Sequence, residues 1–264
     1  MASLIPVTGR ERYEEFHRVP LSMPFDGRRP GMAVHNPPPG VVLPRLAFTE
    51  GYLGRQAKFD EYGLTLVSHN DPMIYLEQDQ PEVEIILGVP QGTRITIKMA
   101  SLDYQKECNE YCLIRALGPN YLFLLRPPMP GFYKFQIHAL PADEAGPQFL
   151  GVYNYMIYQP TGKHGDRPFP KQYPPWKDGC YLYEPISLPR GICDHTVPFK
   201  LLIPRARDVQ IKVGEDWNPL QQTSEPGEFE GFVNFSRGYP SGTKVKVNVK
   251  FSGNSYSTLL EYTI

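Results

Sequence analysis

The chain has 264 residues, with 27 Lys and Arg against 28 Asp and Glu and a formal net charge of −1. This balance gives no long-range field of either sign, so we expect no nucleic-acid partner and no membrane partner. The 29 prolines lack a backbone donor and cannot lie inside helices or central strands, so they favour an all-β protein with many short elements.

Residues 1–60 are rich in turn formers, as in MPFDGRRPG (23–31) and HNPPPG (35–40). Such runs cannot hold a regular element for long. We expect an extended Pro/Gly-rich segment that wraps onto the first domain, with disorder as the alternative. The stretch 1–16 has no charged region followed by an apolar core, so it is not typical of a signal peptide. We therefore expect a cytoplasmic protein with reduced thiols.

From residue 61 to residue 160 apolar side chains recur with a period of two, which is typical of strands. The clearest case is the run 93–99, in which Ile95, Ile97 and Met99 share one face. These residues predict a first β-sandwich. Its predicted strands are 83–87, 93–99, 121–125, 132–138 and 152–158.

Residues 161–180 interrupt this pattern with many Pro and Gly. We predict a Pro/aromatic linker that contains no strand. Because a long segment in a compact protein usually packs against something, Tyr173 and Trp176 are its expected anchors.

The strand pattern resumes over residues 181–264, which predict a second β-sandwich. In the run 244–251 the valines share one face and the lysines the other, as in a half-buried antiparallel strand with a solvated outer face. The other predicted strands are 180–183, 197–203, 209–213, 229–235 and 256–264.

The two halves repeat one succession of strands, so we infer a duplicated unit of about 80–100 residues. Short strands with frequent turn signals predict two tandem immunoglobulin-like β-sandwiches. The Cys…Trp…Cys spacing of antibody domains is absent, and apolar packing alone should hold the sandwiches together.

Four segments resemble the C-terminal region of the kyphoscoliosis peptidase and hillarin family. The most specific motif is Trp176 followed by Cys180-Tyr181-Leu182-Tyr183, and the resemblance covers about residues 60–264. It implies immunoglobulin-like domains, a cytoplasmic protein associated with the cytoskeleton, and partners that are cytoskeletal proteins or members of the same family. The four segments are GLTLVSHNDP (63–72), FPKQYPPWKDGCYLYEP (169–185), IKVGEDWNPLQQTSEPGEFEGFVNF (211–235) and NSYSTLLEYTI (254–264).

In that family a transglutaminase-like thiol-protease core precedes the immunoglobulin-like domains. The motifs that carry its catalytic Cys, His and Asp are not found here, and residues 1–60 are too few to form such a core. The resemblance thus implies the accessory region without the enzyme. We expect no catalytic residue, no cofactor, no metal site and no small-molecule substrate.

Two groups of residues could nevertheless carry chemistry. Cys193-Asp194-His195 holds the residue types of a thiol-protease triad, but neighbours on an extended chain point to opposite faces. We interpret it as a loop that enters the second sandwich. Cys108 and Cys112 have the spacing of a metal or redox pair, but no second Cys/His pair completes a zinc site. Two interpretations of these thiols remain: a local redox pair, or side chains that simply pack in the core.

The remaining histidines and the basic clusters give weaker signals. His164 and Asp166 lie in the linker without an indicated partner, and His35, His69 and His138 form no pattern with carboxylates. Arginines cluster at two places, and nearby acidic residues lead us to interpret the second place as a solvated face. The arginines are Arg28 and Arg29, then Arg205 and Arg207, and the acids are Glu215, Asp216, Glu225, Glu228 and Glu230.

Three hypotheses of function follow. The first is a non-catalytic structural or adaptor protein that binds protein partners through loops and an exposed sheet edge. The second is a thiol hydrolase or transferase that uses Cys193 or Cys180, or an accessory subunit of such an enzyme. The third is a secreted adhesion module with disulfides. The triplet Asn234-Phe235-Ser236 fits a glycosylation site, but it carries no meaning without a signal peptide. We favour the first.

Overall fold

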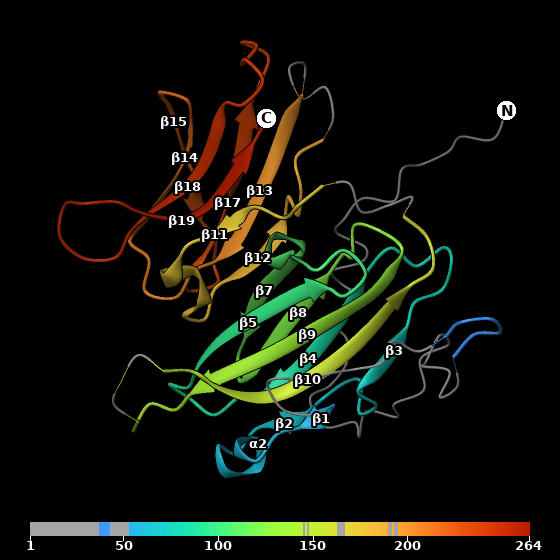
Figure 1. Ribbon diagram of the computed structural model, residues 1–264. Coiled ribbons are helices and arrows are strands. Elements are labelled where there is room, and N and C mark those ends of the chain that lie inside the picture. Colours follow the sequence, from blue (N-terminus) through green and yellow to red (C-terminus); the bar gives the residue numbers. More distant parts are fainter. Residues whose placement is uncertain are drawn as a thin grey trace, which may run out of the picture. The chain divides into compact units, whose positions relative to one another are not determined.

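The computed structural model describes residues 37–42, 53–144, 146, 148–162, 167–189, 192 and 195–264, all within the unit Ala33–Ile264. Most of the expected N-terminal segment 1–60 lies outside these residues, so its docking onto the first domain stays a prediction. The described residues form an all-β protein with four sheets, which confirms the predicted fold class of two tandem immunoglobulin-like β-sandwiches (Figure 1).

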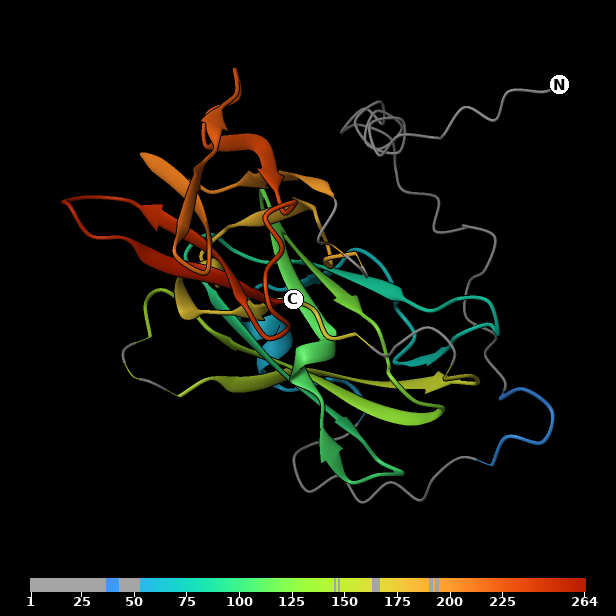
Figure 2. The ribbon, with the colours of Figure 1, turned by 90° about the horizontal axis from the view of Figure 1, so that it is seen from above.

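The larger sheet of the first sandwich is built on two ten-residue strands, β9 and β10, which lie side by side in both views (Figures 1 and 2). β3 (Met73–Tyr75) pairs with β10 in parallel, and every other pairing in this sheet is antiparallel. The main path runs β1 (Gly54–Arg55), β10 (Leu150–Gln159), β9 (Gly131–Leu140), β5 (Arg94–Ser101) and β6 (Lys106–Glu107).

The second sheet of this sandwich covers one face of the first. Phe123 and Phe135, one from each sheet, meet edge to face in the shared apolar core, with ring centroids 5.7 Å apart. The short helices α2 (Lys58–Glu61) and η1 (Asn109–Tyr111) connect strands. The order of this sheet is β2 (Thr65–Leu66), β4 (Val83–Gly88), β8 (Asn120–Leu125) and β7 (Cys112–Leu117).

The second sandwich also has two antiparallel sheets around its own core, in which Phe199 and Tyr262 meet edge to face at 6.0 Å. Its larger sheet runs β11 (Lys171–Gln172), β19 (Ser257–Thr263), β18 (Lys244–Lys250), β14 (Asp208–Val213) and β15 (Asp216–Pro219). Its smaller sheet runs β12 (Tyr181–Glu184), β13 (Thr196–Leu202), β17 (Glu228–Asn234) and β16 (Gln221–Gln222), and η2 (Pro174–Lys177) precedes β12.

The two sandwiches share one strand order. In chain order, β2, β4, β7 and β8 of the first correspond to β12, β13, β16 and β17 of the second, and both sets form a sheet with the A-B-E-D order of an immunoglobulin domain. The partner sheets correspond strand by strand as well, from β1 and β11 onward, and β3 is the one strand of the first without a counterpart among the described residues.

Equivalent side chains confirm the duplication. Phe59 in the helix after β1 and Trp176 in the helix after β11 are both fully buried. Tyr155 in β10 and Tyr262 in β19 occupy the same register position, and each hydroxyl donates to the carbonyl of a loop after the first strand of the smaller sheet. The acceptors are His69 O at 3.0 Å and Pro185 O at 2.8 Å.

One further tyrosine marks the first sandwich as immunoglobulin-like. Tyr133, near the start of β9, donates its hydroxyl to Met129 O at 2.8 Å and accepts from Met129 N at 3.0 Å. This is the tyrosine corner of immunoglobulin folds, in which a tyrosine of strand F bonds back to the backbone just upstream. By register the equivalent residue of the second sandwich is Thr243, whose hydroxyl donates to Pro240 O at 2.7 Å.

The prediction that residues 161–180 contain no strand is wrong. Lys171 and Gln172 form β11, which pairs with β19, and η2 follows directly. The flanking prolines limit this strand to two residues, which is too short to produce a periodic pattern. The predicted anchors are confirmed: Trp176 is fully buried, and Tyr173 donates from its backbone to Leu259 O at 2.9 Å.

The same segment seals the free edge of β7, which sequence periodicity did not identify as a strand. The Gln172 side chain accepts from Ile114 N and donates to Cys112 O, both at 2.8 Å. The Trp176 indole donates to Ile114 O at 2.7 Å, and Ala116 N donates to Cys180 O at 2.8 Å. An edge strand exposes unpaired main-chain groups, and here the start of the second sandwich satisfies them.

Candidate protein-binding face

One row of side chains crosses all five strands of sheet β11-β19-β18-β14-β15. Directly paired residues of an antiparallel sheet lie on the same face, so the register defines the row. Lys171 pairs with Glu261, which pairs with Lys246, which pairs with Lys212, which pairs with Trp217. Four strand spacings of about 4.8 Å make the row about 19 Å long. The valines of β14 and β18 point the other way, into the core.

An exposed aromatic pair lies at one end of this row. Trp217 of β15 and Tyr256, just before β19, are 47% and 37% exposed, and their ring centroids are 5.3 Å apart. Lys212 Nζ lies over the Trp217 ring at 5.4 Å, and Lys250 Nζ lies over the Tyr256 ring at 4.9 Å. These contacts hold both rings on the sheet with their outer surfaces in water.

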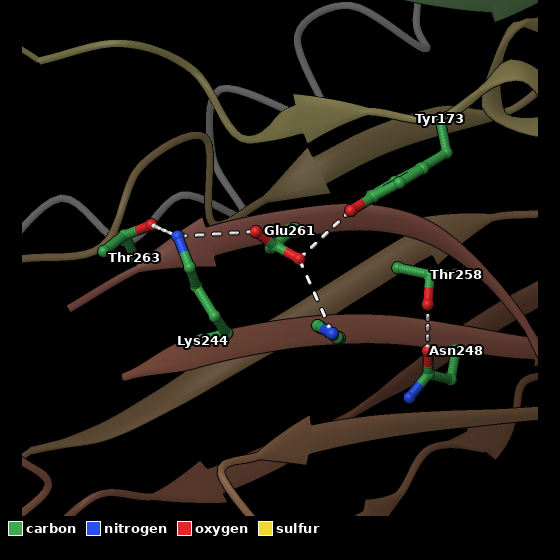
Figure 3. A network of polar contacts seen from close by, with 7 residues as sticks. Tyr173, Lys244, Asn248, Thr258, Glu261 and Thr263 are labelled. Atoms are coloured by element: carbon green, nitrogen blue, oxygen red, sulfur yellow. Dashed lines mark hydrogen bonds and ion pairs between the residues drawn. The ribbon is translucent and has the colours of Figure 1, made fainter. Parts of the chain in front are cut away.

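The partly buried carboxylate of Glu261 lies near the other end of the row and binds the lysines around it. Figure 3 shows Glu261 between Tyr173, whose hydroxyl donates to it at 3.1 Å, and Lys244 at 3.4 Å. Lys246 lies 3.7 Å from the same carboxylate. Partial burial acts to raise the pKa of Glu261, but the hydrogen bonds and the two lysine charges outweigh it and hold the pKa below its ordinary value. Glu261 is therefore ionised and fixes the lysines beside it.

We call this surface the basic face. Its five lysines and three carboxylates leave an excess of two positive charges, since 5 − 3 = 2. Within the described part of the chain, Lys171 and Lys250 have no carboxylate partner. The members of the basic face are Lys171, Lys212, Lys244, Lys246, Lys250, Asp208, Glu215, Glu261, Tyr173, Trp217 and Tyr256.

The corresponding face of the first sandwich is buried at its centre. Asn154 and Gln136 occupy the positions of Glu261 and Lys246, and they are only 1% and 3% exposed. Gln136 donates to the Asn154 side chain at 3.2 Å, so two neutral amides replace the ionic contacts. At these two positions the basic face is the more accessible of the two equivalent faces.

A groove of about 940 Å³ adjoins the basic face where the two sandwiches meet. Lys171, Lys244 and Glu261 belong both to the basic face and to the wall of this groove. Lys177, on the opposite wall, donates to Thr96 Oγ1 at 3.2 Å, and burial lowers its pKa. The basic face thus extends from the aromatic platform formed by Trp217 and Tyr256 to this groove, which is lined by further cationic side chains.

The structure places the thiols in the core or outside the described residues. Cys108, Cys112 and Cys180 are free and buried, and burial raises the pKa of Cys108 and of Cys180 to about 12. Cys108 and Cys112 both lie in the apolar core of the first sandwich. Of the triad-like group, Cys193 and Asp194 lie outside the described residues, and His195 is exposed, with backbone hydrogen bonds to Ile192 and Phe235.

The other candidates do not come together. His35, His164, Asp166, Arg28 and Arg29 lie outside the described residues. Burial lowers the pKa of His69, whose ring contacts Ser68. Arg205 and Arg207 are exposed.

The acidic residues near these arginines contact other cations. Glu228 pairs with Lys200 at 2.9 Å, Glu215 with Lys212 at 3.0 Å and Asp216 with Arg237 at 2.9 Å. In the part of the chain that the structure describes, no group of three His, Cys, Asp or Glu side chains could hold a metal ion. No described helix has the length and apolar character needed to cross a membrane.

Sequence reasoning found the lysines of β18 but missed the aromatic pair. The alternation of Val and Lys in 244–251 predicted a solvated outer face, which the structure confirms. Trp217 and Tyr256 are far apart in the sequence, Trp217 lies outside the predicted strands and Tyr256 is the first residue of one. Only the register of β14, β15 and β18 brings them together.

The family-model comparison agrees with this fold. Residues 49–170 match the model of the KY-like, immunoglobulin-like domain. This range contains the segment 63–72, one of the four on which the resemblance to the kyphoscoliosis peptidase family rests, and it ends within the segment 169–185. The matched range therefore spans the first sandwich and ends just before β11.

No curated protein matches the sequence. Among solved structures, the periplasmic chaperone SfaE is similar at 15% identity over 76% of this chain and 98% of that chain, with a TM-score of 0.26. A titin tandem of Ig domains is similar at 12% identity over 71% of this chain and 90% of that chain, with a TM-score of 0.20. Similarity this low supports no argument about function, so the fold assignment rests on the strand order.

Proposed function

We propose that this protein is a non-catalytic adaptor that binds a protein partner through the basic face of its second sandwich. The observation that carries the proposal is the exposed pair Trp217–Tyr256, which lysines hold on a sheet face whose counterpart in the first sandwich is buried at its centre. Large aromatic side chains are enriched in the energetic centres of protein interfaces, and an immunoglobulin-like fold is compatible with this role.

The cytoskeleton is the proposed location of the partner, and the cytoplasm that of the protein. Both proposals come from the resemblance to the kyphoscoliosis peptidase family, and the KY-like domain at residues 49–170 supports them at the level of the family. The absence of a protease core is likewise part of the proposal. The buried thiols with raised pKa values support a non-catalytic role, because a nucleophilic cysteine needs an accessible thiolate.

Co-sedimentation of the purified full chain with a detergent-insoluble cytoskeletal fraction tests the proposal. We expect saturable binding that falls at least about fivefold in the variant Trp217→Ala/Tyr256→Ala, because the aromatic platform is lost. Phe232→Ala is the matched control, since Phe232 is 74% exposed on the other sheet of the same sandwich and should be dispensable. Absence of co-sedimentation, or an equal loss in both variants, would refute the proposal.

A further inference from the structure

The order of charges along the basic face indicates what kind of partner it fits. Lys212 and Lys246 lie directly opposite each other on β14 and β18. Like charges at such positions destabilise a sheet, and local rules of this kind are broken chiefly at functional sites. Glu215 and Glu261 each neutralise one of these lysines only from the side. A ligand carboxylate above the pair would relieve the repulsion that the protein alone leaves in place.

Two more lysines are available at the ends of the face. Lys171 lies over the Tyr173 ring at 4.9 Å and Lys250 over the Tyr256 ring at 4.9 Å. Each keeps an ammonium group that no carboxylate of the described residues contacts. A negatively charged ligand can pair with both lysines without displacing an existing ion pair.

Carboxylates also lie on the face, and they exclude a uniformly charged ligand. Glu261 occupies the row between Lys171 and Lys246, and Asp208 accepts the Tyr256 hydroxyl opposite Lys250. A nucleic-acid backbone carries one charge per nucleotide and would meet these carboxylates in any register. A peptide can place acidic side chains over the lysines and neutral ones over Glu261, so it matches the alternation.

From these observations we propose that the basic face binds an extended acidic peptide segment of a partner protein, with an apolar side chain of that segment on the Trp217–Tyr256 platform. The row is about 19 Å long, which corresponds to about six residues of extended chain. The groove at the Lys171 end can receive the residues that follow. This inference rests on the proposed adaptor function and adds the chemistry of the partner.

Fluorescence anisotropy with the full chain and labelled eight-residue peptides tests it. The probe peptide carries alternating Asp and Glu around one Leu, and the control peptide has Asn and Gln in their place. We expect the acidic peptide to bind at least about tenfold more tightly at low salt and to weaken steeply as ionic strength rises, because screening removes the charge pairs. Equal binding of the two peptides, or binding of neither, would overturn the proposal.

Charge-reversal variants locate the site. Lys171→Glu and Lys250→Glu should each weaken the acidic peptide by about tenfold. Lys106→Glu, at an exposed lysine of the first sandwich, is the matched control and should change binding by less than about twofold. Trp217→Ala should weaken binding at every salt concentration, since the apolar contact is not screened. A loss in Lys106→Glu as large as in Lys250→Glu would overturn the assignment.

Two comparisons separate this inference from the adaptor function. A single-stranded oligonucleotide that binds more tightly than the acidic peptide would overturn the peptide chemistry. Co-sedimentation that depends on Trp217 and Tyr256, combined with no preference for the acidic peptide, would refute the inference and leave the adaptor function standing. The reverse result would refute the cytoskeletal adaptor and leave the peptide site standing.

Discussion

The two sandwiches share a strand order, yet their equivalent surfaces differ in character. The larger sheet of the first has the buried amides Gln136 and Asn154, where the second has the ions Lys246 and Glu261, which are only partly buried. The first has a tyrosine corner and the extra strand β3, and the second has only Thr243 at the corner position and no counterpart of β3 among the described residues. The strand order is the same in both sandwiches. The outer face of the larger sheet is buried at its centre in the first sandwich and more accessible in the second.

Thiol labelling gives the largest expected effect on this comparison. Burial raises the pKa of Cys108 in the first sandwich and of Cys180 at the start of the second from 9.0 to about 12, which lowers the thiolate fraction about a thousandfold. We expect slow alkylation of both at neutral pH and fast alkylation in guanidinium chloride, mapped residue by residue with mass spectrometry. Rapid labelling of native Cys180, or of Cys193, would revive the thiol-enzyme hypothesis.

Trp176→Ala should be the most destabilising single substitution that we consider, at about 3–5 kcal/mol. Phe59→Ala at the equivalent position should lose a similar amount of core packing but less in total, because only Trp176 also satisfies Ile114 O. Urea denaturation measures both values. Trp217→Ala is the control tryptophan and should change stability by less than about 0.5 kcal/mol, because it is exposed. Equal costs for Trp176→Ala and Trp217→Ala would contradict the anchoring role.

Tyr133→Phe should cost about 1–2 kcal/mol, because it removes a hydroxyl that both donates to and accepts from Met129. Thr243→Val, at the equivalent position of the second sandwich, should cost less, since its single bond lies in an exposed loop. Thermal unfolding of both variants checks this order. A larger cost at Thr243 would show that the tyrosine corner does not stabilise the first sandwich more than its counterpart.

Tyr155→Phe and Tyr262→Phe should have nearly equal effects of about 1 kcal/mol each. Both remove one hydroxyl from equivalent positions, and each leaves one loop carbonyl without its donor. Denaturant titration of the two single variants measures the costs. If one differs from the other by more than about 1.5 kcal/mol, the register equivalence does not extend to energetics.

The smallest effect concerns acid stability. The pKa of Glu261 is lower in the folded chain than in the unfolded chain, so its contribution is present above the unfolded pKa of about 4.3 and is lost as the pH falls through the folded pKa. Since the lysine partners are exposed, this contribution is at most about 0.5 kcal/mol.

Glu261→Gln should therefore flatten the decline of the denaturation midpoint below about pH 4.3. Asp79→Asn, at an exposed carboxylate of the first sandwich, should leave the decline unchanged. The position equivalent to Glu261 in the first sandwich is Asn154, so no matching acid loss is expected there. A decline that is identical in the wild type and in Glu261→Gln would contradict this account.

Strands with one buried and one solvated face were predictable from the sequence, as β18 illustrates with its alternation of Val and Lys. β7 was not predictable, because both of its sides are buried and its sequence therefore does not alternate between apolar and polar residues. β11 is too short to show a period. The lysines of the basic face were visible in β18, but the platform of Trp217 and Tyr256 depends on long-range register, which local patterns do not encode.

Because Gln172, Trp176 and Cys180 occupy the free edge of β7, the first sandwich is not a self-sufficient module. Cut after residue 162, it would expose the unpaired main-chain donors and acceptors of β7, and exposed strand edges of this kind promote aggregation. The segment that begins the second sandwich thus covers an edge that the first sandwich cannot cover itself. A fragment that contains the first sandwich should remain monomeric in solution only if it extends to residue 180.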